Sequence, residues 1–303
     1  MRRVFIGLIL FVGIFYFIRI GEASMSSTNF QIDWDSISHG GLDTSSSSSY
    51  NLRDSFGNIG SGIVTSSSYN LQVGYRAGLY DRLLMMDIQT ISENTQMNVL
   101  SLSGETIEVD TTTNVSIGDL LVVVANRGAS EVDAIGVVVS KTTTSITVDA
   151  LQNAGTSPVI DGVNDYAYVL DGNTASFGTL SSSEVKTTII GWNVTADLKN
   201  GYTVSVLQDG ELRSDSASIT PVSDGLVTAG SEEYGARSSD TTLSLSTFDI
   251  QDTAITSQYQ PVATESGVKF QSRNFLVLKT SISPSTTAGT YNQQLTFMVA
   301  SNF

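Results

Sequence analysis

Short runs of alternating apolar and polar residues dominate this chain from about residue 98 onward. The segments 107–110 and 202–206 alternate strictly, with aliphatic or aromatic residues at one parity and acidic or hydroxyl residues at the other. Because successive strand side chains point to opposite faces, this period of two predicts strands that bury one face. A continuous apolar run at Leu120–Val124 predicts a strand buried on both faces. The chain is therefore predicted to be all-β, with two or three small sandwich or barrel modules in tandem.

Turn-rich sequence divides this β region into two predicted modules. Residues 83–172 predict a small β-barrel or sandwich that closes at the turns Asp161-Gly162 and Asp171-Gly172. Residues 173–303 predict an Ig-like sandwich. Residues 81–97 fit either a short helix or the first strand of the next module. The strands expected in the second module cover residues 185–194, 202–207, 243–248, 268–271, 275–279 and 291–300.

A repeated motif marks residues 24–82. Its aromatic positions Phe30, Tyr50 and Tyr69 recur at nearly equal spacing, and each is followed two positions later by Ile32, Leu52 or Leu71. Residues at i and i+2 share one face of a strand, so the spacing predicts β-hairpins arranged as a small repeat region. A Ser-rich linker is the alternative.

Residues 1–23 have the pattern of a secretory signal peptide. Arg2 and Arg3 precede the apolar run Val4–Ile18, and Gly21 and Ala23 are small residues at a cleavage site. The run is shorter than the ~20 residues that span a bilayer, so cleavage after Ala23 is predicted and a retained anchor is the alternative. The predicted location is extracellular or on the cell surface, with no integral membrane segment after cleavage.

Composition narrows the classes of partner and chemistry. The formal net charge of the 303-residue chain is −15, and cleavage leaves 12 basic and 29 acidic side chains, a net charge of −17. Nucleic acid is not an expected partner, because its binding needs a basic surface. The chain has no cysteine, which excludes disulfides, thiolate metal sites and a Cys nucleophile.

Two stretches resemble known bacterial surface proteins. Residues 27–80 are similar to an N-terminal repeat of exported proteins, with the pattern Ser-Ser-x-Tyr-x-Leu, a Gly-containing turn and a second copy ending at Gly74-Tyr75. The C-terminal region resembles Ig-like and WxL-type wall-associated domains through Gly289-Thr290-Tyr291 and the strand Thr296-Phe297-Met298-Val299. Phe297 and Val299 replace the Trp and Leu of the WxL pattern. The resemblance implies a surface location and a tyrosine that ties the corner before the last strand.

The sequence does not predict an enzyme. His39, the single histidine, lies in a Gly-rich loop, so a catalytic triad or a zinc site would depend on one residue. Asp33 and Asp35 flank Trp34, and carboxylates at i and i+2 on a strand lie about 6.6 Å apart, near the spacing of inverting glycosidases. A solvated strand face is the preferred interpretation of this pair.

Calcium is the one cofactor for which the sequence contains candidate ligands, and no other cofactor is predicted. Asp161, Asn164, Asp165, Asp171 and Asn173 are oxygen donors on two neighbouring turns. Such donors suit Ca²⁺, although their spacing differs from the EF-hand loop. Asp and Asn beside Gly are also ordinary turn residues.

The predicted function is a non-catalytic structural or adhesive role at the cell surface. Partners would be envelope or extracellular components, a glycan, or further copies that associate through strand edges. The first alternative is a carbohydrate-binding module, and the second is a glycoside hydrolase that uses Asp33 and Asp35. The aromatic residues expected to contact a sugar are Trp34, Trp192, Tyr234 and Tyr259.

Overall fold

The computed structural model describes residues 83–302 in full and, before them, only the backbone of six short strands. The chain divides into a unit of residues 1–81 and a unit of residues 82–303. The signal-peptide segment, the pair Asp33/Asp35, Trp34 and His39 lie outside the described residues.

The short strands of the first unit form three antiparallel pairs. Each copy of the repeated motif supplies the second strand of a pair, with Ile32, Leu52 and Leu71 in β2, β4 and β6. Antiparallel pairs of consecutive strands are what the motif predicts, since it predicts β-hairpins. The strands are β1 (Met25–Ser26), β2 (Gln31–Ile32), β3 (Gly40–Ser46), β4 (Asn51–Phe56), β5 (Gly62–Thr65) and β6 (Asn70–Val73).

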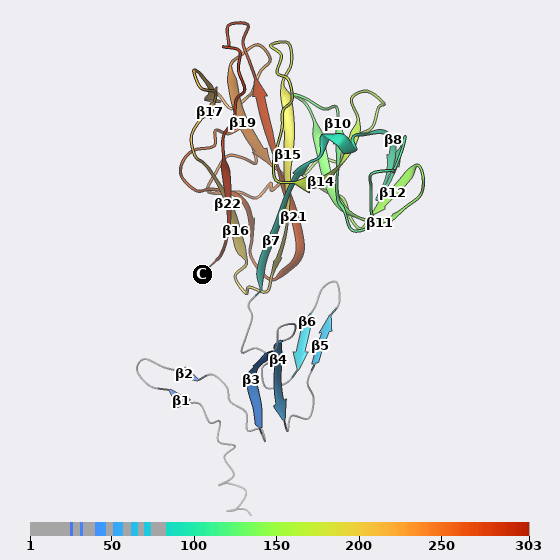
Figure 1. The fold of residues 1–303 in the computed structure, drawn as a ribbon, viewed down its shortest axis with the longest axis vertical. Helices are drawn as coiled ribbons and strands as arrows, with labels where there is room; N and C mark the ends of the chain where they lie inside the picture. The colour runs from blue at the N-terminus through green and yellow to red at the C-terminus, as the bar shows by residue number, and fades with distance from the viewer. Residues whose placement is uncertain are drawn as a thin grey trace, which may run out of the picture. The chain divides into compact units, whose positions relative to one another are not determined.

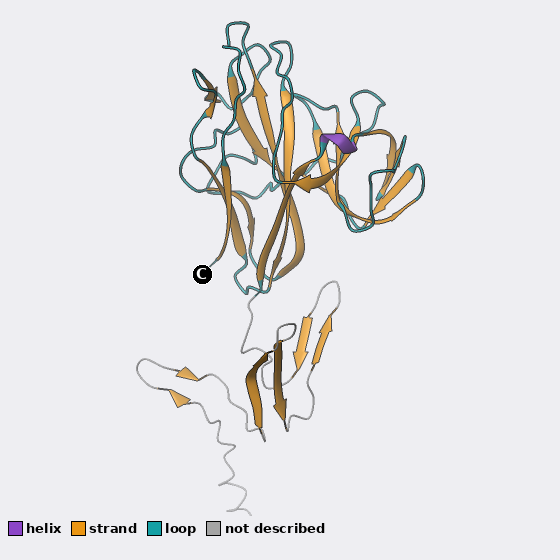
Figure 2. Ribbon diagram, in the orientation of Figure 1, coloured by secondary structure: helices purple, strands orange, loops and turns teal. Residues whose placement is uncertain are grey.

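The second unit is built from strands, which confirms the predicted all-β fold (Figures 1 and 2). Among the described residues the one helical element is a 3₁₀ turn, η1 (Glu93–Thr95). The strands are β7 (Leu84–Ile91), β8 (Met97–Ser103), β9 (Thr106–Val109), β10 (Leu120–Ala125), β11 (Val132–Lys141), β12 (Ser145–Val148), β13 (Gln152–Asn153), β14 (Tyr166–Gly172), β15 (Lys186–Ala196), β16 (Tyr202–Gln208), β17 (Leu212–Arg213), β18 (Ser218–Pro221), β19 (Glu233–Ser238), β20 (Gln260–Glu265), β21 (Lys269–Ser281) and β22 (Leu295–Ser301).

Six of these strands close into a small antiparallel barrel in the order β8-β9-β12-β11-β10-β14, with β14 pairing back to β8. Ile107 and Val109 of β9 and Ile146 and Val148 of β12 point into its core and are buried. The polar residues between them face outward. The alternation seen at residues 107–110 therefore follows from one buried face, and β10 is buried along its whole length as predicted.

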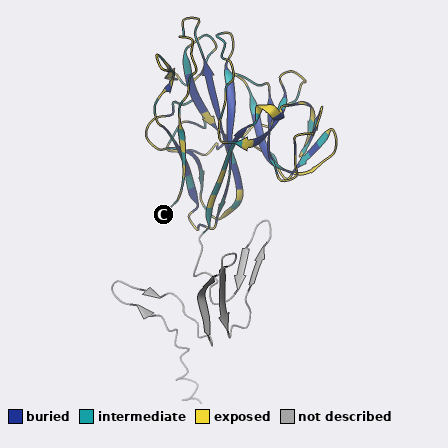
Figure 3. Cartoon of the chain, in the orientation of Figure 1, coloured by how far each residue is buried: buried dark blue, intermediate teal, exposed yellow. Residues whose placement is uncertain are grey.

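The remaining strands form a two-layer sandwich. The order β7-β15-β21-β19-β18-β17 makes one layer, and β20-β16-β22 makes the other. Trp192 of β15, Tyr202 and Val206 of β16 and Leu276 of β21 meet in the core between them. Figure 3 shows these strand centres as buried, with exposure concentrated at the loops and edges. Alternation in β16 is as predicted, because Tyr202, Val204 and Val206 are fully buried.

β7 joins the barrel to the sandwich. It pairs with β15 from Leu84 to Thr90, while Thr90 and Ile91 pair with β14, whose other end pairs with β8. Leu84, Met86 and Ile88 pack against the sandwich core. The described residues of this ambiguous segment thus contain the strand Leu84–Ile91, the second of the two predicted alternatives. The predicted boundary after residue 172 falls inside one compact unit, because a single hydrogen-bonded sheet runs through both modules.

Four predicted strands differ from the structure. Residues 243–248 form a loop, because Asp240 and Ser246 bind backbone groups that turn the chain while Leu243 and Phe248 fill the core. Residues 268–271 and 275–279 belong to one long strand, β21. The last strand is shorter than predicted, and the Tyr291 hydroxyl before it donates to the Thr287 carbonyl at 2.6 Å, which is the expected corner tie.

Candidate functional site

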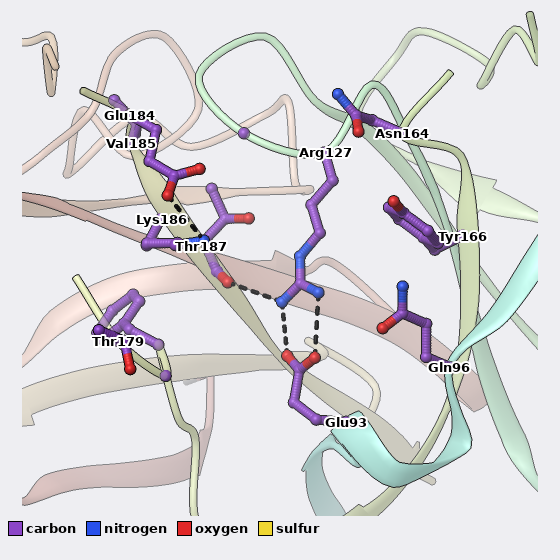
Figure 4. Close-up of a pocket in the computed structure, with 13 residues that line it drawn as sticks. Glu93, Gln96, Arg127, Asn164, Tyr166, Thr179, Glu184, Val185, Lys186 and Thr187 are labelled. Carbon is purple, nitrogen blue, oxygen red and sulfur yellow. Dashed lines mark hydrogen bonds and ion pairs between the residues drawn. The ribbon is translucent and has the colours of Figure 1, made fainter. Parts of the chain in front are cut away.

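A cleft of about 550 Å³ lies where the barrel meets the sandwich (Figure 4). Its walls come from η1, the turn between β10 and β11, the start of β14 and the segment 177–187. Segments from both modules therefore form it, and no single stretch of sequence marks it. The side chains that give it its chemical character are Glu93, Gln96, Arg127, Tyr166, Phe177 and Lys186.

Arg127 forms the charged centre of the cleft and is held from several sides. Its Nη2 and Nη1 donate to the Glu93 carboxylate at 2.5 and 3.1 Å, and Nη1 also donates to the Tyr168 hydroxyl at 2.5 Å. Nη2 reaches the Thr187 carbonyl at 3.2 Å. Burial acts to lower the pKa of Arg127, but the hydrogen bonds and charge of Glu93 outweigh it and raise that pKa. Burial has the opposite effect on the neutral acid Tyr168 and raises its pKa. Because these partners occupy most of its donors, Arg127 fixes the cleft wall.

Two buried carboxylates lie at the start of β11, directly after the Arg127 turn. Glu131 Oε2 accepts hydrogen bonds from the Gly128 N–H at 3.0 Å and from the Thr187 hydroxyl at 2.5 Å. Within the described part of the chain, Glu131 Oε1 and Asp133 Oδ1 are buried without a hydrogen-bond partner. Burial raises the pKa of both carboxyls, and for Asp133 the charge of Glu131 adds to the rise.

Lys279 supplies the opposing charge. Its Nζ lies 3.0 Å from Asp252 Oδ1, and the two side chains are only 9% and 1% exposed. The Lys279 ammonium also lowers the pKa of Glu131 and Asp133, against the larger effect of burial. Lys279, together with Arg127, therefore offsets part of the cost of burying three carboxylates, Glu131, Asp133 and Asp252. The sequence pattern did not predict this cluster, although Glu131-Val132-Asp133 has the same carboxylate spacing as Asp33-Trp34-Asp35 and enters an apolar strand.

Two of the predicted calcium residues, Asp161 and Asp165, accept hydrogen bonds from backbone N–H groups. Asp165 is buried, and its Oδ1 accepts from the Asn126 N–H at 3.0 Å. Its Oδ2 accepts from the Asp161 and Gly162 N–H groups at 2.8 and 2.7 Å. Asp161 Oδ1 accepts from the Val163 N–H, Asn164 borders the cleft, and Asp171 and Asn173 are exposed. The described residues contain no group of three His, Cys, Asp or Glu side chains placed to hold a metal. Calcium binding stays a prediction.

The predicted sugar-contacting aromatics lie in different environments. Trp192 is fully buried and packs on Phe297, with ring centroids 5.7 Å apart. Tyr234 is also buried, and its hydroxyl donates to Gln208 Oε1 at 2.7 Å. A ring without an exposed face cannot stack on a sugar, so the expectation for these two residues is corrected: they build the core. Tyr259 is 50% exposed.

No family model, characterised protein or solved structure matches this chain. Among the residues that the structure describes, no helical segment has the length and apolar character that a membrane crossing requires. The function is therefore inferred from the chain's own residues.

Replacing Asp133 by asparagine is expected to stabilise the fold at alkaline pH. A carboxyl whose pKa is raised by folding contributes full stability below its unfolded pKa of about 4, and this is lost as pH rises through the folded value. The variant should therefore unfold about 2–4 °C above wild type at pH 8, equivalent to roughly 1 kcal/mol. The difference in melting temperature between Asp133→Asn and wild type should narrow toward pH 4.5.

Thermal unfolding followed by circular dichroism at both pH values measures this difference. Asp171→Asn, at an exposed position, is the matched control and should show no pH-dependent gap. An Asp133→Asn variant that melts at or below wild type at pH 8 would contradict this, because it would show that Lys279 and Arg127 offset the cost of burying the carboxylate in full.

Proposed function

We propose that this chain is a non-catalytic, exported cell-surface protein with a structural or adhesive role. The observation that carries the proposal is the continuous hydrogen-bonded sheet that joins the barrel to the sandwich through β7, β14 and β15. Modules linked in this way lack the flexible connection that usually allows domains to move independently. A rigid pair of modules of this kind suits a protein that bears mechanical load or presents a fixed surface to its partners.

An ion pair between a buried arginine and an exposed aspartate links the barrel and the sandwich at the same junction. Arg273 of β21 donates to both oxygens of Asp149, which follows β12 of the barrel, and its Nη1 lies 2.7 Å from Asp149 Oδ1. The Arg273 side chain is 5% exposed. Burial acts to raise the pKa of Asp149, but the Arg273 hydrogen bonds outweigh it and lower that pKa. The backbone N–H of Arg273 also binds Gln152 Oε1 at 3.0 Å. A bidentate pair fixes orientation as well as distance, which supports a rigid connection.

The surface chemistry agrees with an exported role. The chain is acidic, with a net charge of −15. A high net charge keeps proteins soluble. The apolar segment Val4–Ile18 supplies the proposed route of export.

Cell fractionation tests the location. The full chain, expressed with its own Met1–Ala23 segment, should be recovered with the envelope and should be cleaved by protease added to intact cells. The control replaces Leu8 and Leu10 by arginine, which interrupts the apolar run and should retain the protein inside. Wild-type protein found only inside the cell, or only as a free monomer in the medium, would contradict the proposal.

Carbohydrate binding is the second candidate function. The cleft combines two aromatic residues, Tyr166 and Phe177, with the polar side chains Gln96, Asn164 and Lys186. A few polar groups among aromatic rings are typical of small-molecule sites. Calorimetric titration with a panel of wall glycans tests this: Tyr166→Ala should abolish any binding, while Tyr259→Ala should retain it. Binding lost only in Tyr259→Ala would place the sugar elsewhere.

A further inference from the structure

The β22 strand leaves one edge of the sandwich unpaired. Among the described elements, β22 pairs with β16 alone, and none of its residues has a backbone hydrogen bond to any other described element. Its sequence, Leu-Thr-Phe-Met-Val-Ala-Ser, has no charge, no proline and no glycine. Unpaired N–H and C=O groups on such a strand are a template for a further strand.

The opposite edge of the same three-stranded sheet is protected. β20 is the other outer strand, and it contains Pro261 and Glu265. Proline removes a ladder donor and a charge resists pairing, which are the usual ways in which natural sheets block an edge. The difference between the two edges points to β22 as the edge that accepts a partner.

The core is also incompletely covered beside β22. Leu295, Phe297 and Val299 pack against the sandwich core but remain partly exposed, while Thr296, Met298 and Ala300 on the other face are exposed. A strand added to this edge would place its own apolar residues beside Phe297 and Val299. The partner strand must therefore alternate apolar residues as β22 does.

We propose that the partner is β22 of a second copy, paired antiparallel about a two-fold axis at Met298. This register sets Phe297 opposite Val299 of the second copy and Thr296 opposite Ala300. Copies with a net charge of −15 repel one another, so contact is favoured where the strand is neutral. A two-fold contact is self-complementary and closes as a dimer. This inference rests on the proposed structural role, for which the two-fold β22 dimer would be the building block.

Disulfide crosslinking tests the register, because the wild-type chain has no cysteine. In an antiparallel pair, directly opposed residues have Cα atoms about 4.5–5.5 Å apart, within the range that a disulfide bridges. Under mild oxidation with copper phenanthroline, the full chain carrying Met298→Cys should run as a covalent dimer on a non-reducing gel. Val139→Cys, an exposed strand position in the barrel, is the control and should stay monomeric.

A charge variant tests the same contact without a covalent bond. Met298→Lys places two ammonium groups opposite each other and should raise the dimer dissociation constant more than about tenfold in sedimentation equilibrium. Circular dichroism checks that the variant is folded. Crosslinking of Met298→Cys no greater than that of Val139→Cys, or a Met298→Lys dimer as stable as wild type, would overturn the inference. Neither result bears on surface location, which the fractionation experiment tests separately.

Discussion

Lys279→Met is expected to lower the free energy of unfolding by about 3–5 kcal/mol at pH 7, the usual cost of removing one partner of a buried ion pair. Methionine fills a similar volume, so the loss comes from charge. Asp252, Glu131 and Asp133 would all remain buried without the ammonium that now compensates them. The loss corresponds to a drop of roughly 6–20 °C in melting temperature.

The effect should depend on pH in one direction. Lys279 lowers the pKa of Glu131 and Asp133, so its removal raises both further and lets these groups take up protons at a higher pH. The destabilisation should therefore be larger at pH 8 than at pH 5. Denaturant unfolding at both pH values measures it.

Lys186→Met is the matched control. Lys186 lies on the neighbouring strand β15, and its ion pair with Glu184 at 3.0 Å is partly exposed. Removing an exposed pair costs about 0–1 kcal/mol. Equal destabilisation by Lys279→Met and Lys186→Met would refute the idea that Lys279 neutralises a buried cluster.

Trp192→Ala is expected to cost about 3–5 kcal/mol, because it removes a large, fully buried side chain from the sandwich core. Trp192 packs on Phe297 and lies between the two layers, so the cavity would open where β15 faces β16 and β22. The midpoint of urea unfolding measures the loss.

Tyr259→Ala is the control for Trp192→Ala, because it removes an aromatic side chain from the surface rather than from the core. Tyr259 is 50% exposed, and substitutions at exposed positions usually change stability by less than about 0.5 kcal/mol. A stable, well-folded Trp192→Ala variant would mean that Trp192 is not the core residue that its burial indicates.

Local pattern predicted the strands well because the alternation has a local cause. Residues 107–109 and 202–206 show period two because the apolar residues of each strand share one buried face, and both segments are strands in the structure. The pattern failed at residues 243–248, where Leu243 and Phe248 reach the core from a loop. Apolar spacing shows which side chains are buried, but the backbone conformation there depends on hydrogen bonds made by Asp240 and Ser246.

The site was harder to predict because it depends on contacts between distant residues. Arg127 and Glu93 are 34 residues apart, and Arg273 and Asp149 are 124 apart. Aromatic residue type alone could not distinguish the buried Trp192 and Tyr234 from the exposed Tyr259. Residue type also could not distinguish the two roles of Asp165. An aspartate in a turn can accept hydrogen bonds from backbone N–H groups, as Asp165 does, or bind Ca²⁺, and the local sequence is the same in both cases.

Negative-stain electron microscopy of the exported protein, with and without calcium, tests the structural role most directly. We expect ordered assemblies, filaments or lattices, in which the dimer paired through β22 is the repeating unit, and Met298→Lys should impair their formation. A requirement for calcium would in addition implicate the turns at Asp161–Asn173. Discrete monomers at every concentration, with or without calcium, would contradict the structural role and leave a binding module as the remaining function.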